Sequence, residues 1–268
     1  MATRTFDFEG ADGLLLSGRL ELPATTVRGW ALFAHCFTCG KDALAAVWIS
    51  RALAGAGIGV LRFDFAGVGA SEGEFGQTNF ASNVADLVAA AAAMEAAGMP
   101  PALLIGHSFG GAAVLAAAAQ IAPARAVATI AAPFDVAHVL HQFGAHSVGQ
   151  LERAGEADVR LAGRTFRMRK TFVDDVRQQA QAPRIADLGR ALLVMHAPRD
   201  QLVAIEQAGA IFAAARHPKS FVSLDNADHL LSRREDAEYA AAVIAAWSTR
   251  YLAQARTWSR CIARSGAA

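Results

Sequence analysis

The sequence has few cysteines and almost no net charge, and each shortage excludes a class of protein. Three cysteines among 268 residues are an odd count that suits a reducing compartment and not a disulfide framework. The formal net charge is only +1, and no basic stripe stands out along the chain. Binding to nucleic acid therefore has no electrostatic support.

The sequence also shows neither a signal peptide nor an apolar segment long enough to cross a membrane. Residues 1–7 lack the apolar core of a signal peptide. The alanine-rich stretch 84–97 is interrupted by Asp86 and Glu95 and is shorter than the roughly 20 residues that span a bilayer. Apolar residues nevertheless make up 54% of the chain and charged residues 18%. We therefore expect a soluble, cytoplasmic, globular protein with no membrane partner.

Apolar runs that are typical of buried strands alternate with helix-favouring segments along most of the chain. The expected strands cover residues 30–34, 59–63, 102–105, 126–131, 191–196 and 220–224. The expected helices cover residues 43–56, 83–97, 112–120, 205–215 and 235–253. This alternation predicts an α/β fold with a mostly parallel, doubly wound sheet, in which ligands bind at the carboxyl ends of the strands.

Two segments depart from the alternation. Residues 4–22 predict an antiparallel hairpin at an edge of the sheet. Between about 134 and 183 we expect a helical piece over 136–143 and a hairpin with arms 158–161 and 165–169. An insertion at this place predicts a lid. We expect a single domain over residues 1–255, followed by a weakly periodic tail over 256–268.

One stretch organises the rest of the chain. Residues 102–105 are apolar, Gly106 to Gly110 reads Gly-His-Ser-Phe-Gly, and a helix-favouring run follows. A strand, a sharp turn and a helix are the context in which Gly-x-Ser-x-Gly forms a nucleophile elbow. The turn strains the backbone of Ser108, and small neighbours two residues away make room for it. Ser108 is therefore the predicted nucleophile; the plainer alternative is a serine that only caps the helix.

A serine hydroxyl needs a base, and the base needs a carboxylate. His229 follows the last expected strand and is the predicted base, the alternative being a loop histidine that caps the final helix. Asp200 follows the strand at 191–196, and the order serine, aspartate, histidine is that of α/β-hydrolases. Asp135 is the rival acid. Asp64 and Asp228 also lie near strand ends, where we expect them to pin a glycine loop and to cap a turn.

The tetrahedral intermediate of acyl transfer needs two preorganised N–H donors. We predict that the amides of Phe37 and Phe109 supply them. Among the other histidines, His35 and His196 end strands and are expected to brace loops. Cys36 and Cys39 form a Cys-x-x-Cys motif, which is either a redox pair or two small residues in a crowded loop. No second Cys/His pair accompanies them, so we predict no metal.

These motifs resemble the α/β-hydrolase superfamily and, more narrowly, the hydrolase part of bifunctional α/β-hydrolase/OsmC-like proteins. The segments that carry this resemblance are 35–42, 61–73, 106–111, 219–224 and 227–231. It implies the α/β-hydrolase fold with Ser108, Asp200 and His229 as a catalytic triad. Cys36 stands where many hydrolases have glycine, and a cysteine at this position is a feature that the chain shares with this subgroup. We expect no OsmC-like domain to follow, so nothing about peroxide chemistry is carried over from the resemblance.

The sequence therefore predicts a serine hydrolase that cleaves small-molecule carboxylic esters with small to medium acyl groups, without a cofactor. Cleavage of thioesters, lactones or peptides stays open, as does a non-catalytic or redox accessory role beside a peroxide-reducing partner. A homodimer through the edge hairpin or the lid is possible. Five residues are expected either to line the substrate pocket or to form plain lid core: Phe134, Phe143, Phe166, Met168 and Phe172.

Overall fold

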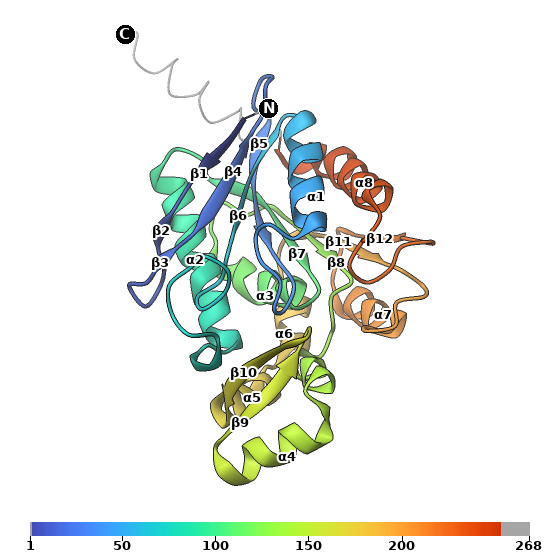
Figure 1. Ribbon diagram of the computed structural model, residues 1–268. Coiled ribbons are helices and arrows are strands. Elements are labelled where there is room, and N and C mark those ends of the chain that lie inside the picture. Colours follow the sequence, from blue (N-terminus) through green and yellow to red (C-terminus); the bar gives the residue numbers. More distant parts are fainter. Residues whose placement is uncertain (1, 253–268) are drawn as a thin grey trace, which may run out of the picture.

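The computed structural model describes residues 2–252 and is built around an eight-stranded sheet (Figure 1). From one edge to the other, the strands are β1 (Ala2–Thr5), β4 (Gly18–Leu22), β6 (Ile58–Phe63), β5 (Gly29–Ala34), β7 (Pro101–His107), β8 (Ala126–Ile130), β11 (Ala191–His196) and β12 (Lys219–Ser223). The six strands from β6 to β12 in this order are parallel to one another. β4 pairs antiparallel with both of its neighbours, β6 and β1. The predicted α/β fold with a mostly parallel sheet is confirmed. The predicted tail, 256–268, lies outside the described residues.

Helices cover both faces of the sheet. One face is covered by α1 (Leu44–Gly55) and α8 (Arg234–Leu252), and the other by α2 (Phe80–Ala96), α3 (Phe109–Ala117) and α7 (Ile205–Ala214). On β5, Ala31 and Phe33 join the core beneath α1 and α8, and Leu32 and Ala34 join the opposite core. Successive side chains of a strand point to opposite faces. Burial on both faces explains why residues 30–34 form an unbroken apolar run.

The N-terminal hairpin is present, but each of its arms is divided into two strands. β1 and β4 pair within the main sheet, while β2 (Phe8–Glu9) and β3 (Leu15–Leu16) form a separate two-stranded sheet. The division falls at Gly18, whose N–H donates to Oδ1 of Asp7 at 3.1 Å instead of to a carbonyl of the ladder. A side chain that replaces a backbone acceptor interrupts the pairing.

The predicted insertion lies between β8 and β11. It contains a 3₁₀ helix (Val136–Gln142), α4 (Gly144–Ala154), β9 (Glu156–Leu161), β10 (Arg164–Arg169), α5 (Lys170–Gln178) and α6 (Gln181–Ala186). The predicted hairpin is confirmed, with Leu161 opposite Arg164 and Glu156 opposite Arg169. We call residues 134–183 the lid. Helices α4, α5 and α6 were not predicted, and the helical piece expected at 136–143 is a 3₁₀ helix.

Two helices begin earlier than the sequence predicts. Helix α2 begins at Phe80 because Asn79 and Ser82 cap it reciprocally: the Ser82 amide donates to Oδ1 of Asn79 at 2.8 Å, and the Asn79 amide donates to Oγ of Ser82 at 3.0 Å. Such a capping box satisfies two N–H groups of the first turn. Helix α3 begins at Phe109, directly after Ser108. Within residues 2–252, every helix is too short or too polar to cross a bilayer.

Candidate active site

Ser108 occupies the tight turn between β7 and α3. Its backbone has φ 53° and ψ −122°, a positive-φ conformation that residues with a side chain rarely adopt. The carbonyl of Ser108 accepts hydrogen bonds from the amides of Gly111 and Ala112, at 2.8 and 3.3 Å, which start the helix. The strained serine predicted from the Gly-x-Ser-x-Gly motif is therefore present, at the carboxyl end of a central strand.

The two glycines of the motif, Gly106 and Gly110, lie so close to neighbouring backbone that neither position has room for a side chain. A Cβ on Gly106 would lie 2.3 Å from the carbonyl oxygen of Gly110, and a Cβ on Gly110 would lie 2.4 Å from that of His35. Neither obstacle can move without displacing backbone, so no other residue fits. The contact between Gly110 and His35 also shows that the start of α3 is pressed against the loop that follows β5.

The structure brings Ser108, Asp200 and His229 together in one hydrogen-bonded chain. Oγ of Ser108 lies 2.9 Å from Nε2 of His229, and Nδ1 of His229 lies 2.7 Å from Oδ2 of Asp200. The three side chains come from the loops after β7, β11 and β12 and are almost fully buried, with exposed fractions of 4, 8 and 6% for the serine, aspartate and histidine. Residues 121 positions apart in the chain thus meet at one edge of the sheet.

The second oxygen of Asp200 is held by its own loop. The amides of Leu202 and Val203 donate to Oδ1 at 2.8 and 2.9 Å. Burial raises the pKa of the Asp200 carboxyl, but hydrogen bonds from His229 and from these two amides outweigh burial and hold the pKa below its ordinary value. Asp200 is therefore an anion near neutral pH, and it accepts the Nδ1–H of His229.

Asp135, the rival acid, has another role. It is exposed, and its Oδ1 accepts the amide of Ala137 at 2.9 Å, which caps the 3₁₀ helix of the lid. Asp228, beside the histidine, accepts the amide of Ser232 at 2.9 Å, the capping role predicted for it. Of the two acids weighed in the sequence, only Asp200 contacts His229.

Phe37 lies in a tight turn formed by residues 36–39. The amide of Cys39 donates to the carbonyl of Cys36 at 3.1 Å, and Thr38 has a φ of 61°. Within residues 2–252, no hydrogen bond uses the backbone N–H of Phe37 or of Phe109. The two phenylalanine rings have centroids 5.1 Å apart, so the turn lies beside the start of α3. We call residues 36–39 the oxyanion turn, after the role predicted for Phe37.

The count of cysteines argued against disulfides, and for two of the three cysteines that expectation is wrong, whereas the Cys-x-x-Cys spacing had left a redox pair open. Cys36 and Cys39 are joined by a disulfide, with their Cα atoms 5.3 Å apart. The turn places the two residues at the distance that a disulfide requires, whereas the count of cysteines in the sequence says nothing about their geometry. Cys261 lies outside the described residues. The bridge closes the oxyanion turn covalently, in addition to its backbone hydrogen bond.

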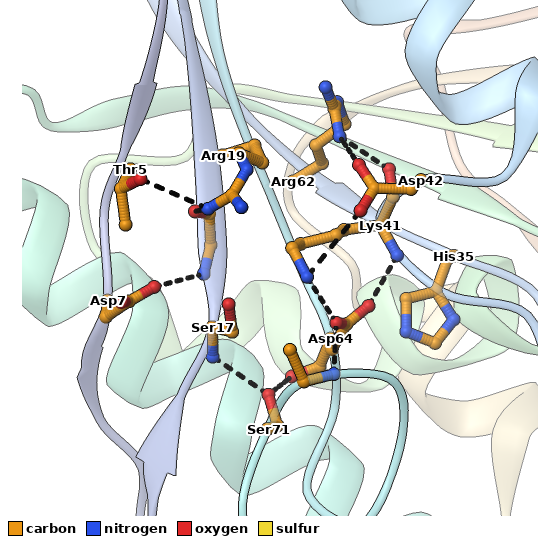
Figure 2. Close-up of polar contacts among 12 residues, drawn as sticks. Thr5, Asp7, Ser17, Arg19, His35, Lys41, Asp42, Arg62, Asp64 and Ser71 are labelled. Carbon is orange, nitrogen blue, oxygen red and sulfur yellow. Dashed lines mark hydrogen bonds and ion pairs between the residues drawn. The ribbon is translucent and has the colours of Figure 1, made fainter.

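A buried ion pair, which the sequence analysis did not single out, fastens the segment that follows the oxyanion turn (Figure 2). Nζ of Lys41 contacts Oδ2 of Asp64, and the Lys41 amide donates to Oδ1 of Asp64 at 2.6 Å. Asp64 also accepts the amide of Ala70 at 2.9 Å, which is the pinning of the glycine loop that we predicted. Arg62 binds the carbonyl of Lys41 at 2.7 Å and Oε1 of Glu21 at 2.8 Å.

Phenylalanines from the lid pack against the oxyanion turn. The rings of Phe143 and Phe172 stack with centroids 5.4 Å apart, and each lies near Phe37, at 6.1 and 5.5 Å. Phe37, Phe109 and Phe172 also line a small pocket. Of the remaining candidates, Met168 is fully buried in the lid core, and Phe134 and Phe166 are half-buried. Of the five candidates, Phe172 lines this pocket, and Phe143 stacks on Phe172.

Among the described residues, no group of three or more His, Cys, Asp or Glu side chains is arranged to hold a metal ion. The groups that the site does bring together can perform nucleophilic attack by a hydroxyl, proton transfer by an imidazole and electrostatic stabilisation by backbone amides.

A parallel sheet with a strained serine after a central strand, and with an aspartate and a histidine after later strands, defines the α/β-hydrolase class of folds. The profile of the alpha/beta hydrolase family matches residues 29–242. The chain belongs to this family. Among curated proteins, no sequence is significantly similar to it.

Solved structures show the same fold. The esterase domain of a Rhodothermus marinus protein is 47% identical, with a TM-score of 0.76, and the match covers 94% of this chain and 100% of that one. A putative hydrolase from Agrobacterium vitis S4 is 19% identical, with a TM-score of 0.75 and coverage of 91 and 98%. Est1E from Butyrivibrio proteoclasticus is 16% identical, with a TM-score of 0.74 and coverage of 93 and 99%.

Proposed function

We propose that the protein is a serine hydrolase that cleaves carboxylic esters through an acyl-enzyme intermediate, with Ser108, His229 and Asp200 as its catalytic triad. The observation that carries the proposal is the pair of hydrogen bonds made by His229, 2.9 Å to Oγ of Ser108 and 2.7 Å to Oδ2 of Asp200. These distances are those within which a base takes a proton from a hydroxyl.

In the acylation step, Oγ of Ser108 attacks the ester carbonyl and its proton passes to Nε2 of His229. The imidazolium that forms is stabilised by the anionic Asp200, whose hydrogen bond to Nδ1–H also fixes the tautomer. His229 then gives the proton to the departing alcohol. In deacylation, water attacks the acyl carbonyl while His229 takes its proton. His229 then returns this proton to Oγ of Ser108 as the acyl bond breaks, and the acid is released.

The oxyanion of each tetrahedral intermediate is bound by the backbone amides of Phe37 and Phe109. Support comes from the absence of any other hydrogen bond to these two N–H groups in the part of the chain that the structure describes. Phe109 is the first residue of α3, where free N–H groups and the helix dipole favour negative charge.

A small to medium acyl group suits the site because the lid phenylalanines limit the space next to Phe37. Phe143 and Phe172 are 5 and 2% exposed, and their rings stack 5.4 Å apart. The relative from Rhodothermus marinus is described as an esterase domain, which supports an ester as the substrate. The same acyl-transfer machinery leaves cleavage of thioesters, lactones or peptides open, since the triad also cleaves peptides on unrelated folds. Specificity constants on matched oxygen esters, thioesters, lactones and peptides rank these possibilities.

The Ser108→Ala variant tests the proposal directly. Assayed on p-nitrophenyl acetate and butyrate, it should show no turnover above background, because the nucleophile is gone. A matched control is Ser147→Ala, which removes the same hydroxyl from a half-buried position on α4 and should keep the wild-type rate. Wild-type turnover in Ser108→Ala would show that the triad assignment is wrong.

A redox accessory role is the second candidate, and the disulfide between Cys36 and Cys39 is the observation that favours it. Such a module would cycle its disulfide beside a peroxide-reducing partner and would not use Ser108. A fluorophosphonate probe separates the two functions. A mass increase on Ser108 with the state of the cysteines unchanged supports hydrolysis, and the opposite pattern supports the redox role.

A further inference from the structure

Three buried histidines lie at the carboxyl ends of three parallel strands of the sheet, of which β5 and β7 are neighbours and β11 is separated from β7 by β8. His35 follows β5, His107 ends β7 and His196 ends β11, and their exposed fractions are 3, 4 and 0%. Each uses one ring nitrogen to bind a backbone carbonyl in a loop that carries part of the proposed site. We predicted such bracing for His35 and His196 from the sequence. The partner of His107 was not predicted, because the elbow motif draws attention only to Ser108.

His107 binds the backbone of the proposed base. Its Nε2 lies 2.7 Å from the carbonyl oxygen of His229, and the two imidazole rings have centroids 5.6 Å apart. A carbonyl only accepts hydrogen bonds, so Nε2 of His107 must carry the proton. His107 directly precedes Ser108. One strand end therefore fixes both the nucleophile and the backbone of the residue that must reach it.

A histidine at a strand end also holds the loop that carries Asp200. Nε2 of His196 donates to the carbonyl of Val203 at 2.7 Å, while the amide of Val203 donates to Oδ1 of Asp200. The loop that wraps the carboxylate is thus held from the end of its own strand. Within residues 2–252, Nδ1 of His196 is buried and has no hydrogen-bond partner, which suits a neutral ring whose proton is on Nε2.

At the oxyanion turn, Nδ1 of His35 donates to the carbonyl of Cys36 at 2.8 Å, and its Nε2 accepts the amide of Phe65 at 3.4 Å. The carbonyl of Cys36 and the N–H of Phe37 belong to one planar peptide and point in opposite directions. A bond that holds the carbonyl on one side therefore aims the N–H to the other side, where the oxyanion is expected.

Burial keeps the three rings neutral. It lowers the pKa of His35 and of His196, and burial together with the nearby His229 lowers the pKa of His107 to about 4. At neutral pH each ring therefore donates one N–H and adds no charge beside His229, whose Nε2 must stay free to take the proton of Ser108.

We propose that His107 is a positioning residue for the reaction: its N–H holds the backbone of His229 so that Nε2 of that imidazole faces Ser108. His35 and His196 do the same for the oxyanion turn and for Asp200. The inference rests on the proposed function, since it assigns roles relative to that triad. None of the three histidines touches the reacting atoms in this assignment.

Two substitutions at His107 separate hydrogen bonding from packing. Glutamine is neutral and has an amide N–H at about the place of Nε2, whereas leucine fills similar space and donates nothing. His107→Leu should lower kcat by about 100-fold, the effect of misplacing a reacting group by about 1 Å, with KM changed less than about threefold. His107→Gln should stay within about fivefold of wild type. His146→Leu, at an exposed lid position, is the matched control and should equal wild type.

Rates are expressed per active site titrated with a fluorophosphonate, so that a poorly folded fraction does not count. The pH profile of kcat/KM adds a readout that a packing defect does not move. In His107→Leu the displaced His229 loses part of its contact with Asp200, its cation is less stabilised, and the acid limb shifts to lower pH. The limb should stay in place in His107→Gln and His146→Leu.

The contact itself is tested on the wild-type protein by ¹⁵N NMR of the imidazole groups, without any substrate. His107 should be neutral with its proton on Nε2 between pH 6 and 8; a proton on Nδ1 or on both nitrogens overturns the proposal. So does a full kcat in His107→Leu, or a loss in His107→Gln as large as in His107→Leu. If Ser108→Ala is inactive in the same experiment, these failures leave the proposed function standing.

Discussion

At the scale of single residues, Asp200 and Asp135 show how two carboxylates with similar sequence contexts take different roles. Both follow buried strands. Asp200 lies 2.7 Å from Nδ1 of His229, and Asp135 caps a 3₁₀ helix in the lid. The chain order of the family favours Asp200, and the structure places Asp200, not Asp135, against His229.

Asp200→Asn should lower kcat by about 10³- to 10⁴-fold, because an amide cannot stabilise the imidazolium and no longer selects the tautomer. Asp135→Asn keeps the capping oxygen and should leave kcat unchanged. Steady-state kinetics on p-nitrophenyl butyrate measure both. Equal activities in the two variants would remove Asp200 from the triad.

Asp86 is a buried carboxyl away from the triad. It lies on α2, is 4% exposed and accepts the amide of Ala66 at 3.1 Å. Burial, together with the nearby Asp12, raises its pKa to about 6, although hydrogen bonds from the amides of Ala66 and Ala11 oppose the shift. The folded protein then holds a proton on Asp86 that the unfolded chain has already released. Its contribution to stability therefore decreases as pH rises from about 4 to about 6.

Asp86→Asn should remove this part of the pH dependence. Between pH 4 and pH 7 the wild type should lose up to about 3 kcal/mol of unfolding free energy relative to the variant, because only the wild type must release the proton of Asp86. Urea unfolding at the two pH values measures it. Parallel pH dependences in the two proteins would show that Asp86 ionises at its ordinary pKa in the fold.

At the scale of elements, the oxyanion turn is held by several restraints within a few residues. It is closed by the disulfide and by the bond from Cys39 N–H to the Cys36 carbonyl, and Lys41 fastens the residues after it to Asp64. Thr38 has a φ of 61°, unusual for a β-branched residue. Spacing alone left the state of the cysteines open, because pairing depends on the turn that places them.

Cys39→Ser should lower kcat by about tenfold or more, because a looser turn holds the Phe37 amide less firmly and an oxyanion donor contributes about 100-fold or more. Dithiothreitol should reduce the wild-type rate to the same level, and reoxidation should restore it. The reductant should leave Cys39→Ser unchanged, which controls for effects elsewhere in the protein. A wild-type rate that is insensitive to complete reduction contradicts this prediction.

The elements that sequence reasoning located best are those with both a strong pattern and a fixed place in the sheet. All the central strands were predicted, because burial on both faces makes each an apolar run. Helices α4, α5 and α6 were missed because each buries only a few residues. These are Leu151 in α4, Phe172, Val173 and Val176 in α5, and Gln181 and Ile185 in α6. The start of α2 was predicted three residues too late because the capping side chains of Asn79 and Ser82 set it, and the period of the apolar residues does not show them.

At the scale of the whole molecule, the lid and the α/β body are joined by aromatic packing over the proposed site. Phe143 and Phe172 from the lid meet Phe37 from the body, with ring centroids 6.1 and 5.5 Å from it. The sequence suggested these residues as pocket candidates but could not separate them from Met168, which is plain lid core. Contacts between residues more than 100 positions apart follow from the fold and not from local pattern.

Phe172→Leu should favour longer acyl chains. The smaller side chain opens space beside Phe37 and Phe109, so the ratio of kcat/KM for p-nitrophenyl hexanoate over acetate should increase by about tenfold, the value of one or two methylenes in an apolar pocket. This ratio of two specificity constants does not depend on the fraction of folded enzyme, because that fraction enters both constants equally. Phe221→Ala, on the edge strand β12 and 38% exposed, should leave the ratio unchanged. An unaltered ratio in Phe172→Leu would place the acyl group elsewhere.

The central claim is that Ser108 is activated by His229. Fluorophosphonate treatment followed by mass spectrometry of the digested protein tests it most directly, because the probe reacts with activated serines. The account predicts an adduct on Ser108 of the wild type and labelling slower by at least about 100-fold in His229→Ala. No adduct on Ser108, or equal labelling rates with and without the imidazole, would contradict it.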